Sequence, residues 1–163
     1  MRLRGAAVDA YVGQLAELLE RFGVVLQRPA PGEPIEVLEA ADGSLSFELV
    51  GALPDGRQPV LATLEVREEF RALDSGLFER SRYEFEIVDR ERDFRRAFHL
   101  HSAEWFQGRH LVLVHEHCER PIGRARCDHF EGRPIRDGFA GIVTLMDAWT
   151  GDQPDCDTLR CLD

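Results

Sequence analysis

The sequence predicts an α+β domain: an N-terminal helix, a twisted antiparallel sheet of five or six strands, and a C-terminal helix packed on the sheet. Three observations predict it. Apolar residues recur at helical spacing near both ends, alternating segments separated by turns lie between them, and the composition is globular, with 44% apolar and 31% charged residues. The 163 residues suit one domain, which we expect over residues 1–150, followed by an acidic tail over residues 151–163.

Both helices are indicated by apolar residues three or four positions apart. The first set comprises Val8, Tyr11, Val12, Leu15, Leu18, Leu19 and Phe22. Gly23 follows directly and is typical of a helix end. Near the other end Asp137 can cap a helix over residues 138–149, whose apolar stripe includes Phe139 and Trp149.

The middle of the chain is expected to form an antiparallel meander. Turn sequences such as Ala41-Asp42-Gly43 separate its segments, and in YEFEI apolar residues alternate with glutamates. The expected strands include Ile35–Glu39, Leu45–Val50, Val60–Val66, YEFEI, FRRAFHLH and LVLVHEH.

The charge pattern limits the classes of partner and mechanism. All 20 basic residues are arginine, so mechanisms that need a lysine are excluded. A net charge of −10 argues against wrapping of nucleic acid by the whole surface. Residues 80–136 nevertheless carry 12 arginines against 10 acidic residues, so an anionic ligand would bind there if anywhere.

No secretory signal or run of roughly 18 apolar residues is visible. We therefore expect a cytoplasmic protein without membrane contact, whose four cysteines are reduced thiols or metal ligands. Cys156 and Cys161, in the tail, are expected to be free or an oxidisable pair.

Two H-x-H pairs are the most distinctive feature, because alternate strand positions face the same side of a sheet. His99 and His101 form one pair, and His115 and His117 form the other. The connection Ser102–Gly108 is too short for a parallel crossover and predicts a hairpin. In that hairpin His101 lies near His110, and the two pairs are on the order of 15 Å apart, which excludes a combined four-histidine site.

Two separate clusters are therefore predicted. The candidate zinc ligands are His115, His117, Cys127 and His129, the residue types of a tetrahedral site. Cys118 points away from them. The secondary cluster comprises His99, His101, His110 and Glu104. The alternative for the first cluster is a hydrogen-bonded polar end of a central strand.

Catalysis without a metal is a competing hypothesis. A histidine beside arginines suits phosphodiester cleavage, since imidazole moves the proton and guanidinium stabilises the phosphorane. His115 and His117 would be the acid–base groups, and Arg95 and Arg96 would bind phosphate. Glu116 or Glu119 would orient a histidine. The alternative for RERDFRR is a solvated ion-pair lattice.

Residues 83–149 resemble, in layout, the TumE-like toxins of bacterial toxin–antitoxin pairs. The shared features are the strand YEFEI, the arginine-bearing FRRAF, the histidine-rich HEHCE and a closing helix with Trp149. Where those toxins carry an Arg-Tyr-Asp-Asn type of strand, this chain has Arg95-Arg96-Ala97-Phe98. The resemblance implies a cytoplasmic RNA-cleaving toxin, or a relative of one, in a defence or regulatory operon.

Three functions follow as hypotheses. The leading one is a small hydrolase acting on RNA or another phosphodiester, with an antitoxin or complex subunit as its protein partner. The second is a non-enzymatic subunit with a structural zinc that docks on a basic partner. The third is an interaction domain with neither metal nor activity.

Overall fold

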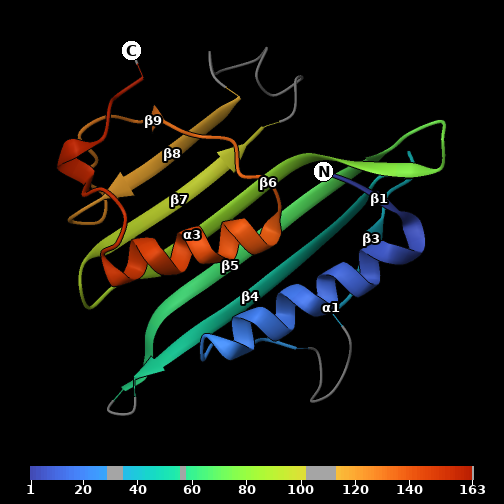
Figure 1. Cartoon of the computed structure of the whole chain (residues 1–163). Helices are drawn as coiled ribbons and strands as arrows, with labels where there is room; N and C mark the ends of the chain where they lie inside the picture. The colour runs from blue at the N-terminus through green and yellow to red at the C-terminus, as the bar shows by residue number, and fades with distance from the viewer. Residues whose placement is uncertain (29–34, 56–57, 102–112, 163) are drawn as a thin grey trace.

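The computed structural model describes residues 1–28, 35–55, 58–101 and 113–162. Nine strands and two α-helices occur in these ranges (Figure 1). The elements are β1 (Arg2–Arg4), α1 (Gly5–Arg21), β2 (Val25–Leu26), β3 (Leu38–Glu39), β4 (Leu45–Asp55), β5 (Gln58–Ala72), β6 (Leu77–Asp89), β7 (Phe94–Leu100), β8 (Val114–Glu119), β9 (Phe130–Glu131), α3 (Gly138–Thr150) and the 3₁₀ turn η1 (Cys156–Thr158).

The strands form one antiparallel sheet in the order β2-β4-β5-β6-β7-β8-β9, with β1 paired to β6 and β3 paired to β4. The α+β prediction with a helix at each end is confirmed, but the predicted count of five or six strands is too low. The additional strands β1, β2 and β9 are two or three residues long, and β3 is the end of the strand predicted at Ile35–Glu39. Such segments are too short to show a periodicity in the sequence.

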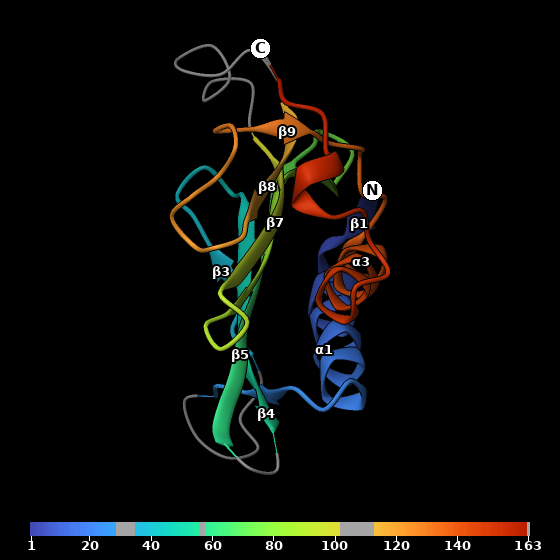
Figure 2. The same ribbon diagram turned by 90° about the vertical axis from the view of Figure 1, so that its left-hand side faces the viewer.

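Both helices cover the same face of the sheet, and the other face carries none of the described helices (Figure 2). The hydrophobic core lies between the two layers. Tyr11 of α1 contacts the rings of Phe47 and Phe70, with centroids 6.1 and 6.2 Å away. Gly141 lets α3 approach so closely that an added Cβ would lie 2.5 Å from the Phe85 ring.

The predicted ends of the helices are confirmed by their caps. The Asp137 carboxylate accepts a hydrogen bond from the Ala140 N–H at 2.9 Å. Gly151 follows α3 with a φ of 93°, and Gly23, after α1, has a φ of 83°. These left-handed conformations favour glycine, which explains why both helices end there.

A buried polar network ties α1, β5, β6 and the segment before α3 together. Glu68 is fully buried and accepts hydrogen bonds from Tyr11 Oη at 2.8 Å and Arg80 Nη1 at 2.5 Å. Tyr11 Oη in turn accepts from the Gly138 N–H at 2.6 Å, and Arg80 donates to the Ile135 carbonyl. Burial raises the pKa of Glu68, and the Arg80 guanidinium opposes that shift.

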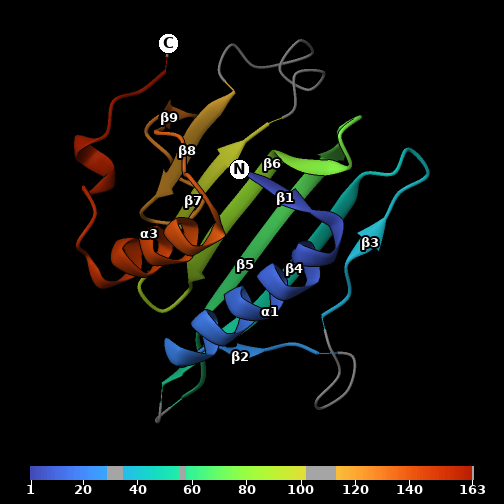
Figure 3. The same cartoon turned by 45° about the vertical axis from the view of Figure 1, so that its right-hand side comes forward.

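The end of the predicted acidic tail is held in place rather than loosely packed. After α3 the chain passes through η1 and returns to β9 (Figure 3). Disulfide bonds join Cys118 to Cys156 and Cys127 to Cys161. The Leu162 N–H also donates to the His129 carbonyl at 3.0 Å. The expectation of reduced thiols is therefore wrong for this structure.

The β7–β8 hairpin has a different register from the predicted one. His99 lies opposite His115, and Arg95 lies opposite Glu119. The predicted hairpin placed His115 and His117 near Arg95 and Phe94, at the start of β7, whereas they lie opposite His99 and Ala97. The predicted turn at Ser102–Gly108 and its neighbour His110 lie outside the described residues.

Two glycines give a matched test of the helix packing. Gly141→Ala should lower the free energy of unfolding by about 1–3 kcal/mol, because the new methyl group overlaps the Phe85 ring. Gly13→Ala, in α1 with nothing within 4 Å of its Cβ, should raise it by about 0.5–1 kcal/mol. Urea denaturation measures both changes. Equal effects of the two substitutions would contradict the close approach of α3.

Candidate metal centre

Five histidines gather on the sheet face opposite the helices. His99 lies on β7, His115 and His117 lie on β8, His101 directly follows β7, and His129 directly precedes β9. The register places His99 and His115 opposite each other, so their side chains share one face. We refer to these five residues as the histidine cluster.

His115 is at the centre of the cluster. Its Nε2 lies 3.0 Å from Nε2 of His117 and 3.4 Å from Nε2 of His101. Its ring centroid lies 4.5 Å from that of His129 and 5.2 Å from that of His99. Ligand nitrogens on one tetrahedral zinc ion are about 3.3 Å apart, given Zn–N bonds of about 2.0–2.1 Å. These separations suit ligands of one ion, and they are also hydrogen-bond distances between imidazoles.

Two overlapping groups of three histidines have ligand atoms within 4.8 Å of one another, and a third group, Glu84, Glu86 and His99, shares His99 with them. The inner group, His99, His101 and His115, is buried, with residue exposures of 6%, 7% and 1%. The outer group is His115, His117 and His129, of which the last two are half-buried. The cluster thus runs from a buried end to a partly exposed end.

The electrostatics favour neutral imidazoles, which is the form that binds a metal. Burial, reinforced by His117, His115 and His101, lowers the pKa of His99 to about 2. Burial, followed by the charge of Arg95 and by His129, lowers the pKa of His117 to about 4. At neutral pH both side chains therefore present lone pairs rather than charge.

Carboxylates and one arginine border the cluster. Glu84 Oε1 lies 3.5 Å from His99 Nε2. Arg95, on the same face, donates to both oxygens of Glu86 at 3.1 and 2.9 Å and also pairs with Glu119. Arg95 is therefore near His117, as predicted, but its guanidinium is held by two glutamates.

The segment between β8 and β9 brings His129 to the cluster. It lies on the face away from the helices (Figure 2). Glu119 accepts the Gly123 N–H at 2.7 Å, and Asp93 accepts the Ile122 N–H at 2.9 Å. Beyond β9, a Cβ added to Gly132 would lie 2.8 Å from His115 Cα. Only a glycine allows the chain to pass His115 this closely.

The predicted zinc ligands are partly corrected. His115, His117 and His129 come together, but the sulfur of Cys127 is bonded to Cys161 and is not offered as a thiolate. The secondary cluster is not separate, because His99 and His101 join the same group. The expected 15 Å gap, and the exclusion of a combined site that rested on it, are therefore wrong. His110 and Glu104 lie outside the described residues.

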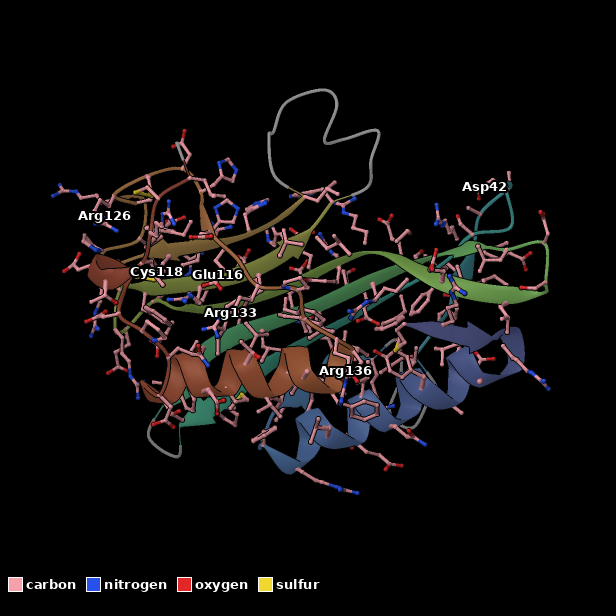
Figure 4. The ribbon with its side chains drawn as sticks, turned by 45° about the horizontal axis from the view of Figure 1, so that its top comes forward. Asp42, Glu116, Cys118, Arg126, Arg133 and Arg136 are labelled. Atoms are coloured by element: carbon pink, nitrogen blue, oxygen red, sulfur yellow. A yellow bond between two sulfur atoms is a disulfide. The ribbon has the colours of Figure 1, made fainter. Side chains whose placement is uncertain are left out.

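The metal-free catalytic arrangement is also corrected. Arg96 and Glu116 point to the helix side of the sheet, since they share the face of Ile87 and Phe85. Arg96 is 2% exposed and donates to Glu116 at 2.6 Å. Glu116, labelled in Figure 4 with Cys118 and Arg133, lines a cavity of about 430 Å³ on that side. Neither residue can act beside His115.

Sequence reasoning found the residues of the cluster but missed its unity. The H-x-H pairs marked four of the five histidines, and the C-x-H pair marked His129. The register of β7 against β8 could not be predicted, because no local pattern in this segment determines it. The approach of Glu84 to His99 depends on a second register, that of β6 against β7.

Comparison with known proteins found no matching family model, curated relative or solved structure. The resemblance to TumE-like toxins stays a prediction. Among the described residues no helix is long and apolar enough to cross a membrane. Two disulfide bonds are more typical of oxidising compartments, so a cytoplasmic location also stays a prediction.

The lowered histidine pKa values predict a pH dependence for the metal-free protein. Below the ordinary pKa of 6.5, the unfolded chain binds protons that native His117 refuses until about pH 4. Stability should therefore fall as the pH falls through this window. Between about pH 7 and about pH 5, the free energy of unfolding should fall by about 1 kcal/mol less in His117→Gln than in the wild type. This value is reduced because His117 is partly exposed to solvent.

Urea denaturation of chelator-treated protein measures this difference. Arg124→Ala, in an exposed part of the β8–β9 segment, serves as the control and should keep the wild-type slope. An unchanged slope in His117→Gln would show that His117 titrates normally in the folded protein.

Proposed function

We propose that this chain binds a divalent transition-metal ion, zinc first among them, through the histidine cluster. The observation that carries the proposal is the position of His115 Nε2, 3.0 Å from His117 Nε2 and 3.4 Å from His101 Nε2. His115 thereby belongs to two groups of three histidines whose ligand atoms lie within 4.8 Å of one another, and each group is a preformed set of ligands.

The type of ligand selects the class of metal. Imidazole nitrogen suits zinc, copper, nickel and iron, whereas magnesium and calcium prefer oxygen ligands. Arg95 already holds both oxygens of Glu86, so this carboxylate contributes little to the choice of metal. A neutral cluster also avoids the cost of removing a proton when the metal binds.

Purified protein should contain about one equivalent of zinc, because His115 belongs to both groups of three. His115→Ala should reduce the content to about a tenth or less, since each group then keeps only two imidazoles. Elemental mass spectrometry after dialysis measures the content. Arg124→Ala is the control and should keep the zinc. Wild-type protein that binds no zinc, copper or nickel would end the proposal.

A second candidate function is metal-dependent hydrolysis of RNA or another phosphodiester. The half-buried His117 and His129 favour it, because a three-histidine site that faces solvent leaves a coordination position for water. A zinc-bound water has a pKa near about 7 and is a nucleophile at neutral pH. The competing proposal is a non-enzymatic subunit that binds the same metal, docks on a partner protein and turns nothing over.

Turnover separates these two candidates. Zinc-loaded protein should cleave RNA or bis(p-nitrophenyl) phosphate. His129→Ala should lower the rate by about 100-fold or more, since this substitution removes one imidazole ligand from the solvent-facing metal site. Cleavage at the wild-type rate by the His115→Ala/His117→Ala double variant would rule out the hydrolytic role of the cluster. Zinc binding without any turnover would leave the interaction subunit.

A further inference from the structure

One nitrogen atom serves both groups of histidines. Nε2 of His115 is the atom that faces His117 in the outer group and His101 in the inner group. A neutral imidazole nitrogen has one lone pair and binds one ion at a time. The two groups therefore describe two overlapping positions for a single ion rather than a two-metal centre.

Glu84 borders the inner position through His99, with which it and Glu86 form a separate group of three candidate ligands. Glu84 Oε1 lies 3.5 Å from His99 Nε2, close to the separation of about 3.3 Å expected between two ligands of one tetrahedral ion. His99 is more than nine-tenths buried, and within the described part of the chain its Nε2 makes no hydrogen bond. A buried polar atom without a hydrogen bond is costly unless a ligand satisfies it.

The outer position is different in access and in coordination. His117 and His129 are half-buried, whereas all three imidazoles of the inner group are more than nine-tenths buried. Their ring centroids lie 5.1 Å apart, and each lies within 4.8 Å of the His115 centroid. An ion arriving from solvent meets this end of the cluster first.

We propose that a single divalent ion is captured at the outer position and then transferred to the inner position, where Glu84 completes its coordination. This inference rests on the proposed metal binding. During the transfer the bonds from the ion to His117 and His129 break, and bonds to His99, His101 and Glu84 form. The bond to His115 is kept, so the ion is never released to solvent.

The transfer gives the cluster a directional role. The outer position, open to water, exchanges ions easily, and the inner position, with four protein ligands, retains them. The species that the outer position takes up is the hydrated divalent ion. The two positions also differ in reactivity, because only the outer one leaves a place for water.

Ligand variants of the full chain test the two positions. Zinc binding is followed by competition with a chromophoric chelator, and the uptake rate is followed by stopped-flow mixing with zinc-free protein. His101→Ala and His129→Ala should each still bind one ion, with affinity lowered by about tenfold or more, because each leaves one position intact. The His101→Ala/His129→Ala double variant should bind none.

The kinetics separate capture from retention. His129→Ala should take up zinc more slowly, on the order of tenfold, because the exposed position is damaged. His101→Ala and Glu84→Gln should take it up at the wild-type rate but lose it faster to the chelator. Thr63→Ala, on the same sheet face but outside the cluster, is the control and should match wild type in both measurements.

Cobalt(II) gives a readout on the unaltered protein. Rapid mixing should produce weak visible absorption first and the stronger absorption of a tetrahedral ion afterwards. A single phase would overturn the transfer. Two tightly bound ions per chain would overturn the shared position, and loss of binding in both single variants would show one site with all ligands. No metal in wild type would instead remove the proposed function itself.

Discussion

The register of β7 against β8 determines both sides of this half of the sheet. With His99 opposite His115, the imidazoles of both strands face outward together, and Arg96, Glu116 and Cys118 face the helices. A one-residue slip would exchange the two faces of β8. It would place Glu116 and Cys118 beside His99 and turn two imidazoles towards the core. The candidate metal ligands, the buried ion pair and one disulfide bond all depend on this pairing.

The buried polar network is connected to the histidine cluster through the segment before α3. Glu68, Tyr11 and Arg80 hold the segment that leads into α3, through the Ile135 carbonyl and the Gly138 N–H. That segment begins at Gly132, which rests against His115. Residues 132–138 therefore connect the buried polar network to the strand that carries His115.

The sequence predicted the parts of this protein whose pattern is local. The apolar spacing of α1, the Asp137 cap and the alternation in β6 each involve neighbouring residues, and all three are confirmed. The register was wrong because it was derived from a turn expected at Ser102–Gly108, and the polar strand VHEHCE has no apolar alternation that fixes its offset against β7. The disulfide bonds were missed because the cysteines were expected to be reduced in the cytoplasm.

The two disulfide bonds interleave along the chain, since Cys127 lies between Cys118 and Cys156, and Cys156 lies between Cys127 and Cys161. A protease that cuts anywhere between residues 119 and 160 leaves two fragments that are still covalently joined. A cut in α3 or its flanks leaves them joined by both bonds. The oxidised protein can thus be nicked in this region and keep both fragments, including every histidine of the cluster, in one molecule.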